Sequence, residues 1–171
     1  HTDIPPLELV IHCKNSSIKN VIISAAEIHN SPGVHLVILY DITQRKQIEA
    51  KLNAIFNASV EGIITIDRSD IIISVNAAVE TIFGYKPEEL MGCSINKLMP
   101  SSLKEMDDCS LPGAVKCVGQ IREIEGIYKN GSVVPLDLSI AKYSIDNARY
   151  YTYIVRDVSL RKQRERQDKE H

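Results

Sequence analysis

Tryptophan is absent from the 171 residues, and phenylalanine occurs only twice. No apolar run approaches the ~18–20 residues of a membrane span, and the first residues show no signal-peptide pattern. We therefore expect a segment that makes no membrane contact and works in the cytoplasm, whether or not a parent protein carries an anchor elsewhere. The formal net charge of −2 gives no sequence-wide attraction to nucleic acid, so no nucleic-acid partner is expected.

The cysteines are scattered. Cys13, Cys93, Cys109 and Cys117 contain no C-x-x-C pair, which is the spacing typical of zinc sites and redox motifs. A chain of this length also has no need of a disulfide framework. The sequence therefore predicts reduced thiols and no metal site.

Catalytic motifs are missing as well. The sequence contains no phosphate-binding loop, no dinucleotide-binding glycine pattern, no zinc-protease motif and no serine-hydrolase motif. Its five histidines are His1, His12, His29, His35 and His171, so a Ser-His or Cys-His dyad cannot form within residues 36–170. Asp107 and Asp108 are adjacent and do not face one another. We therefore predict that this chain is not itself an enzyme.

The chain does contain an internal repeat. Lys14–Ser17 matches Lys129–Ser132 at an offset of 115 positions, and Asp41–Gln47 matches Asp157–Gln163 at an offset of 116. Between these anchors, Val21, Ile23 and Ser24 fall on Leu136, Leu138 and Ser139. An offset of this size suits tandem globular domains rather than a solenoid. Since residues 1–47 match only the rear of the second copy, the first copy is expected to lack its front half.

The first 58 residues predict a three-stranded meander and a helix. Strands are expected at 7–14, 18–27 and 34–40, because these apolar, β-branched runs are separated by turn signals. Thr43 is a candidate N-cap for a linker helix over 44–58. The candidate dimer residues on one face of that helix are Ile48, Leu52, Ile55 and Phe56. Such an apolar seam can pair with its copy in a parallel homodimer.

The remaining residues predict an α+β domain. Strands are expected at 61–67, 71–75, 118–129, 133–143 and 149–156, and short helices at 77–83, 86–90, 94–99 and 101–108. Asn76 is a candidate N-cap for the first of these helices, and Gly84 ends it. The order predicts a five-stranded antiparallel sheet with short helices on one face. The domain boundaries are then 1–43 for the partial first domain, 44–58 for the linker helix, 59–158 for the complete domain and 159–171 for an exit helix.

Seven short motifs in this region, in order, resemble the S-box type of PAS sensor domain. They are Glu61–Asp67, Val75–Ala78, Phe83–Tyr85, Glu89–Gly92, Leu98–Pro100, Lys129–Ser132 and Val155–Ser159. The resemblance covers residues 58–160, and residues 7–47 resemble the rear half of a preceding PAS domain. It implies tandem PAS domains of a bacterial or archaeal signalling protein.

Within PAS domains, the sequence is most similar to the haem oxygen sensors of nitrogen-fixation kinases. Arg122 falls on that group's distal arginine, and Leu138 and Ile140 fall on its distal apolar residues. The proximal haem histidine, however, is replaced by Asp107. Haem ligated by histidine is therefore not expected, and Met106 or Cys109 is the remaining alternative for an iron ligand.

The flavin photosensors of this fold give a similar result. Their reactive cysteine is replaced here by Ile95, and Cys93 lies two positions early. The missing tryptophan removes one common stacking partner for a flavin. The sequence therefore assigns no cofactor.

Alternate strand positions and the first short helix predict a small-ligand site between sheet and helices. Its candidate residues are Ile64, Ile66, Asn76, Val79, Phe83, Leu98, Arg122, Leu138 and Ile140. The alternative is that the apolar members are ordinary core and that Arg122 forms an ion pair with Glu123 or with a helix carboxylate.

Two strand-to-helix exits are candidate relay points, formed by Asp41, Thr43 and Arg45 and by Asp157, Ser159 and Arg161. Each aspartate can cap the following backbone amides or pair with the arginine four residues on. The resulting hypothesis is a sensory relay module of a histidine kinase, with a downstream output domain in the parent chain and a small-molecule ligand. The alternatives are a PAS module of a diguanylate cyclase, phosphodiesterase or transcription regulator that acts purely through protein interaction, and a haem or flavin redox sensor.

Overall fold

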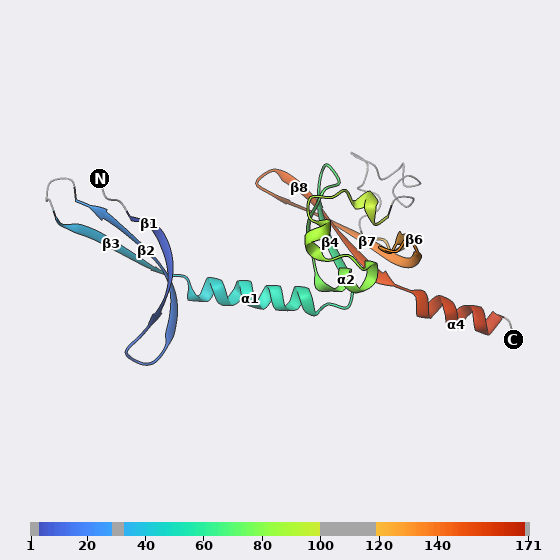
Figure 1. Cartoon of the computed structure of the whole chain (residues 1–171), viewed down its shortest axis with the longest axis horizontal. Helices are drawn as coiled ribbons and strands as arrows, with labels where there is room; N and C mark the ends of the chain where they lie inside the picture. The colour runs from blue at the N-terminus through green and yellow to red at the C-terminus, as the bar shows by residue number, and fades with distance from the viewer. Residues whose placement is uncertain (1–3, 29–32, 100–118, 170–171) are drawn as a thin grey trace. The chain divides into compact units, whose positions relative to one another are not determined.

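A computed structural model describes residues 4–28, 33–99 and 119–169. The chain divides into two units, residues 1–54 and 55–171. In the first unit, β1 (Ile4–His12), β2 (Ile18–Glu27) and β3 (His35–Asp41) form an antiparallel sheet in the order β1-β2-β3 (Figure 1). Helix α1 (Thr43–Ala58) follows directly. The predicted meander is therefore formed.

Strand β1 begins earlier than the predicted Leu7. Its pairing with β2 is irregular between Ile4 and Leu7, where Pro5 and Pro6 interrupt the chain. Proline has no amide hydrogen to donate and is tolerated only at strand edges and irregularities. The predicted strand began after Pro6, whereas β1 begins before the two prolines, at Ile4.

The second unit contains a five-stranded antiparallel sheet with short helices, which confirms the α+β prediction (Figure 1). The strand order across the sheet is β5-β4-β8-β7-β6. The elements are β4 (Gly62–Asp67), β5 (Ile72–Val75), α2 (Ala77–Phe83), α3 (Pro87–Leu90), the 3-10 helix η1 (Ile95–Lys97), β6 (Arg122–Ile127), β7 (Val133–Ile145), β8 (Ala148–Asp157) and α4 (Ser159–Lys169).

The core of this unit lies between the sheet and the helices. Buried side chains from β4, β7 and β8 meet Val79, Ile82 and Phe83 of α2 in one cluster. Tyr151 and Tyr153 belong to it, although sequence reasoning did not select them. Burial of apolar surface of this extent is the main force that holds sheet and helices together.

Gly126 of β6 lies where the backbone approaches the core closely. A Cβ atom at this position would lie 2.6 Å from Leu136 Cδ1 and 2.8 Å from Phe83 Cε1. A side chain there would require Leu136 and Phe83 to move from their packed positions. The glycine is therefore required by packing and not by its backbone angles.

Strands β6, β7 and β8 differ in length from the prediction. Strand β6 was expected at 118–129 but begins at Arg122 and ends at Ile127, where the hairpin turn begins. Strands β7 and β8 are longer, because Asp146 and Asn147 adopt positive φ values of 49° and 64° and close a tight turn. Paired positive φ angles match the twist of an antiparallel hairpin. The predicted helix over 101–108 and the residues Met106, Asp107 and Cys109 lie outside the described residues.

Candidate functional site

The apolar candidates for a ligand site are all buried. Those from the sheet are Ile64, Ile66, Leu138 and Ile140, and those from the helical side are Val79, Phe83 and Leu98. All seven belong to the same core cluster. The structure therefore brings together the residues that the sequence selected, and it places them in mutual packing contact.

Arg122 is placed differently. It begins the edge strand β6 and is exposed. Its register partner is the buried Leu138, and directly paired residues of an antiparallel sheet share one side of it. Glu123 next to it holds Arg161 and Lys162 of α4. Arg122 is thus on the correct side of the sheet but at its rim.

Asn76 joins three segments of the second unit. Its side-chain amide donates to the carbonyls of Phe56 (3.0 Å) and Glu61 (2.9 Å), and its side-chain oxygen accepts from the Ile63 amide (2.9 Å). The residue is completely buried. Burial makes these bonds costly to lose, because each partner would be left without water.

Asn76 is the N-cap residue of α2, as predicted, but its side chain is used elsewhere. That side chain makes no capping bond. Asn57 Oδ1 accepts from the Ala77 amide instead, at 3.1 Å. As a result, Phe56 and Asn57, at the end of α1, are both tied to the start of α2.

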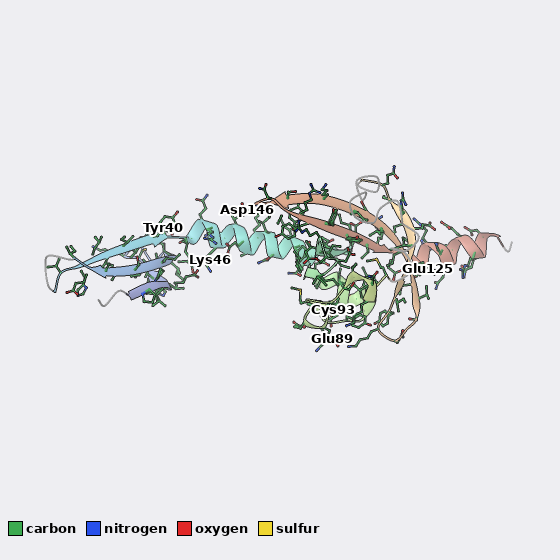
Figure 2. All side chains as sticks on the ribbon, turned by 90° about the horizontal axis from the view of Figure 1, so that it is seen from above. Tyr40, Lys46, Glu89, Cys93, Glu125 and Asp146 are labelled. Atoms are coloured by element: carbon green, nitrogen blue, oxygen red, sulfur yellow. The ribbon has the colours of Figure 1, made fainter. Side chains whose placement is uncertain are left out.

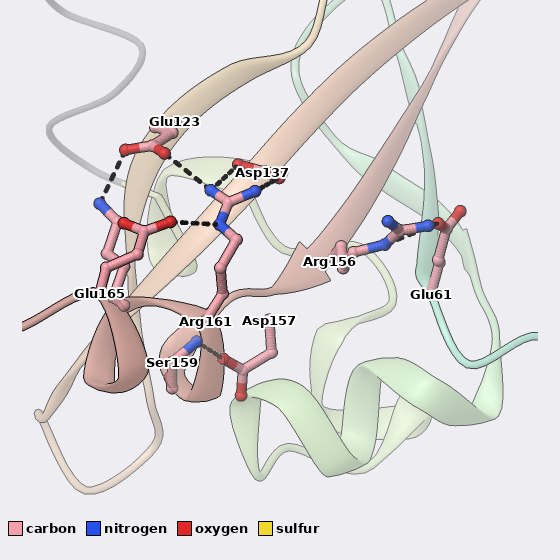
Figure 3. A network of polar contacts seen from close by, with 9 residues as sticks. Glu61, Glu123, Asp137, Arg156, Asp157, Ser159, Arg161 and Glu165 are labelled. Atoms are coloured by element: carbon pink, nitrogen blue, oxygen red, sulfur yellow. Dashed lines mark hydrogen bonds and ion pairs between the residues drawn. The ribbon is translucent and has the colours of Figure 1, made fainter. Parts of the chain in front are cut away.

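At the second strand-to-helix exit, Asp157 caps the exit helix (Figure 3). Its Oδ1 accepts from the Ser159 amide at 2.8 Å. Val158 between them is buried, and its amide donates to the Pro135 carbonyl of β7 at 3.1 Å. The first turn of α4 is thereby fixed to the sheet through its backbone.

Arg161 adds an ionic link from α4 to two strands. It reaches Asp137 of β7 at 3.0 Å and Glu123 of β6 at 2.7 Å (Figure 3). Lys162 also reaches Glu123, at 2.8 Å. The predicted alternative of an ion pair between Asp157 and Arg161 is therefore not formed. We call Glu123, Asp137, Arg161 and Lys162 the ionic clasp.

The clasp shifts the pKa values of Glu123 and Arg161. The hydrogen bond from Lys162 and its positive charge lower the pKa of Glu123, with a smaller contribution from Arg161. Asp137 likewise raises the pKa of Arg161. Both groups are solvent-exposed, so salt screens these attractions.

The first exit repeats this arrangement. Asp41 Oδ1 accepts from the Thr43 amide at 3.0 Å, and the buried Ile42 donates to the Asn20 carbonyl at 2.8 Å. Lys46 reaches Glu8 at 2.7 Å. At the repeat offsets these residues correspond to Asp157, Ser159, Val158, Pro135, Lys162 and Glu123. The two exits thus share their backbone bonds and one ion pair.

Two details of the first exit depart from the prediction. Thr43 begins α1, but its hydroxyl accepts from the Asn20 amide at 2.9 Å instead of capping the first turn. Arg45 pairs with Glu49 at 3.0 Å, and Asp41 pairs with Lys19 at 2.8 Å. The pKa of Asp41 is lowered, chiefly by the hydrogen bond from Lys19. Arg45 therefore does not bind Asp41.

Each exit also borders a groove. Thr43 and Gln47 line one of 460 Å³, and the corresponding Ser159 and Gln163 line one of 360 Å³. The grooves thus occupy matching places in the repeat.

The candidate dimer residues of α1 are largely uncovered. Ile48, Leu52 and Ile55 are exposed, and Phe56 is partly buried. No residue of this helix is buried.

Sequence reasoning missed the carboxylates that hold Arg161. Asp137 lies between Leu136 and Leu138, so strand alternation places it on the side opposite the core. The outward position of Asp137 could therefore have been predicted from the sequence. The pairing of Asp137 with Arg161 could not, because the two residues are 24 positions apart and lie on β7 and α4.

Across the described ranges, no group of three or more His, Cys, Asp or Glu side chains is arranged to hold a metal ion. The same part of the chain contains no helix long and apolar enough to cross a membrane.

The chain matches the PAS domain family over residues 60–159. It belongs to that family. It is 36% identical over 95 residues to a probable serine/threonine-protein kinase of Dictyostelium discoideum, covering 53% of this chain and 6% of the relative. It is 28% identical over 138 residues to the sensor protein FixL of Bradyrhizobium diazoefficiens, covering 74% of this chain and 27% of the relative. The chain thus spans a minor part of these relatives' lengths.

Solved structures agree on the fold. A PAS domain from a two-component sensor histidine kinase superposes with a TM-score of 0.57 at 16% identity, covering 66% of this chain and 98% of that domain. The second unit is therefore a PAS sensor domain of the kind found in signalling proteins.

The residues of this domain do not fit a haem held by histidine, because positions 36–170 contain none. Nor do they fit the cysteine adduct of flavin photosensors. Ile95 stands at the reactive position and is buried in the core cluster, and Cys93 is bonded through its thiol to the Glu89 carbonyl at 3.3 Å.

Proposed function

We propose that this chain is a sensory relay module of a larger signalling protein, in which a change in the PAS core passes to the exit helix α4. The observation that carries this proposal is the linkage of both helices to one domain. The end of α1 is tied through Asn76 and Asn57, and the start of α4 is tied through Asp157 and the ionic clasp.

The route from core to exit helix runs through β7. Leu136 and Leu138 of this strand lie in the core, whereas Asp137 between them binds Arg161 on the other side. A shift of β7 that repacks its two leucines also moves Asp137. A signal passes by this route only if the ligand or partner favours one of two arrangements of strand and helix.

The output domain that best fits this module is a histidine kinase. The similarity to FixL and to the PAS domain of a two-component kinase supports it. A diguanylate cyclase, a phosphodiesterase or a transcription regulator uses the same kind of module and remains the alternative. On this proposal the chain itself performs no catalysis and works in the cytoplasm.

The input is proposed to be a small molecule bound between sheet and helices, near Ile64, Val79 and Leu138. A second candidate is a module without ligand, which relays only changes in protein contacts. The mutual packing of the candidate residues favours this second possibility. An absorption spectrum and mass spectrometry, under native and denaturing conditions, distinguish them. A released colourless molecule supports the first, an empty protein supports the second, and a haem or flavin band contradicts both.

The proposed oligomer is a parallel homodimer through α1. Ile48, Leu52 and Ile55 follow spacings of four and three residues and leave more than half of each side chain exposed. An uncovered seam of this spacing is stabilised by pairing with its copy.

Residues 4–41 are proposed to form the rear meander of a first PAS domain. Val21, Ile23 and Leu39 share one side of its sheet and correspond to Leu136, Leu138 and Val155 of the second core. In the second unit β8 is also paired with β4, whereas its counterpart β3 has one neighbour among the described strands. A β4-like strand and short helices would complete this first domain.

A further inference from the structure

Arg156, near the end of β8, lies between two carboxylates on the side of the sheet opposite the core. Its register partner on β7 is Asp137, and the Cβ atoms of such partners are about 5 Å apart. On the other side of β8, Gly62 of β4 pairs with Val155, so Glu61 lies one position further, beside Arg156. The guanidinium of Arg156 therefore has a carboxylate on each side.

Arg156 binds Glu61 and not its register partner (Figure 3). Its Nε donates to Glu61 Oε1 at 3.0 Å, and its Nη2 donates to the same oxygen. Asp137 is held by Arg161 of α4, whose Nη1 donates to Oδ2 at 3.0 Å and whose Nη2 donates to Oδ1 at 3.3 Å. The two arginines are thus divided between the two carboxylates.

Glu61 is also tied to the end of α1. The side-chain amide of Asn76 donates both to the Glu61 carbonyl and to the Phe56 carbonyl in the last turn of the helix. A displacement of this turn therefore moves the connection between α1 and β4. The contact between Glu61 and Arg156 depends on where α1 ends.

We infer that Arg156 is a positioning residue that switches between Glu61 and Asp137, and that this switch sets how firmly α4 is held. When Glu61 moves away, Arg156 turns to Asp137, whose side chain is only 15% exposed and therefore little screened by solvent. Two like charges then share one carboxylate, and Arg161 is held less firmly. The inference rests on the proposed function, because it gives the same exit helix a second input, which comes from α1 and bypasses the core.

The first exit has no equivalent of this switch. Arg156 corresponds in the repeat to Tyr40, which Figure 2 labels on the first sheet, and Asp137 corresponds to Ile22. The aspartate cap and the lysine–glutamate pair, in contrast, are present at both exits. Arg156 is therefore not needed to build an exit of this kind, which agrees with a separate role.

The two partners of this ion pair should respond differently when each is neutralised in the full 171-residue chain. Glu61→Gln releases Arg156 and should speed hydrogen exchange of the Lys162 amide, in the first turn of α4, by about twofold. Arg156→Gln leaves Asp137 to Arg161 alone, so the exchange rate should be unchanged or slower. The double variant should also not exceed the wild-type rate, because the competing guanidinium is absent.

Glu89→Gln is the matched control, because Glu89 forms an exposed ion pair with Lys129 elsewhere in the same unit. It should leave exchange of the Lys162 amide unchanged. Circular dichroism and urea unfolding check that each variant folds. Equal acceleration by Glu61→Gln and Arg156→Gln would show that the pair is merely structural and would overturn the inference. Acceleration that persists in the double variant, or no effect of Glu61→Gln, would overturn it as well.

The variant Leu138→Ala separates this inference from the proposed relay through the core. If Leu138→Ala speeds exchange of the Lys162 amide and Glu61→Gln does not, the switch fails and the relay through β7 stands. If Glu61→Gln acts only in the presence of Arg156 and Leu138→Ala has no effect, the relay through the core fails and the switch stands.

Discussion

The two strand-to-helix exits of this chain share one construction and lead into different helices. In both, an aspartate accepts from the amide two residues on, a buried Ile or Val follows it, and a lysine of the first turn binds a glutamate of the first meander strand. Beyond that turn, Ile48 and Leu52 of α1 correspond to Arg164 and Asp168 of α4. The exit geometry is thus independent of the surface that the following helix presents.

The two sheets that precede the exits differ in how far their apolar side chains are buried. Val21 and its counterpart Leu136 are both buried. Leu138, Val155 and Tyr153 are also buried, whereas their counterpart Ile23 is partly buried and their counterparts Leu39 and Val37 are exposed. Hydrogen bonds at turns and exits therefore define the meander equally well in both copies. Covering by other elements decides how much apolar burial each copy gains.

The largest expected change in stability comes from Gly126, which lies in the sheet that helices cover. Gly126 corresponds to Ile11 in the first unit, so the covered copy excludes a side chain that the other carries. Gly126→Val should lower the free energy of unfolding by about 3 kcal/mol, because the new side chain meets Leu136 and Phe83. Urea unfolding measures it. Ile11→Gly should cost less than about 1 kcal/mol, and equal costs would contradict the assigned packing.

The next largest effect concerns Asn76. Asn76→Ala should cost about 2 kcal/mol, because the Ile63 amide and the carbonyls of Phe56 and Glu61 lose their buried partner. Urea unfolding again measures the loss. The exposed Asn57 provides the matched control, and Asn57→Ala should cost about half as much. If Asn76→Ala costs no more than Asn57→Ala, the three hydrogen bonds of Asn76 do not stabilise the connection between the end of α1 and the start of α2.

The contrast between the two helices predicts where dimerisation resides. Leu52→Lys should weaken association about tenfold, because it places a charge in an apolar seam. Sedimentation equilibrium measures it. Asp168→Lys, at the corresponding place in α4, should leave association unchanged. An effect of Asp168→Lys comparable to that of Leu52→Lys would move the dimer contact out of α1.

A smaller effect separates the two arginines. Arg161 binds two strands, whereas Arg45 pairs with Glu49 in its own helix. Arg161→Gln should therefore speed hydrogen exchange of the first-turn amides of α4 by about two- to fivefold. Arg45→Gln should change exchange at the start of α1 by less. Equal effects of Arg161→Gln and Arg45→Gln on hydrogen exchange would show that the contacts of Arg161 with the two strands do not stabilise the start of α4.

The smallest effect is pH dependence at the second exit. The pKa of Glu123 is lowered from 4.5 by Lys162 and Arg161, so its contribution is fully present above pH 4.5 and is lost as pH falls through the lower folded value. Protection of the Lys162 amide, corrected for intrinsic exchange, should fall between pH 5 and pH 3. Glu123→Gln should remove this dependence, and an unchanged profile in that variant would exclude Glu123 as its source.

Much of this architecture was predictable because it depends on local signals. Strand alternation and the repeat offsets led to the sheet, and Gly84 ends its helix as predicted. The failures were side-chain choices that depend on tertiary neighbours. Asn76 has a capping position but bonds to Phe56, Glu61 and Ile63, and Thr43 of α1 accepts from the Asn20 amide of β2.

The candidate site was predictable to the same degree. Seven apolar residues were selected by their faces, and they do share one core. Arg122 lies on the expected side, but its place at an edge strand depends on the strand order β8-β7-β6. Periodicity predicts on which side of the sheet a residue lies. The order of the strands decides whether that residue lies at the edge or at the centre of the sheet.

Hydrogen exchange in a matched pair of core variants tests the relay most directly. Leu138 and Ile23 correspond in the repeat, and neither is a member of the ionic clasp. The account predicts that Leu138→Ala speeds exchange of the Lys162 amide at the start of α4, because a loosened β7 moves Asp137, and that Ile23→Ala does not. Faster exchange along β7 with an unchanged Lys162 amide in Leu138→Ala would contradict the relay.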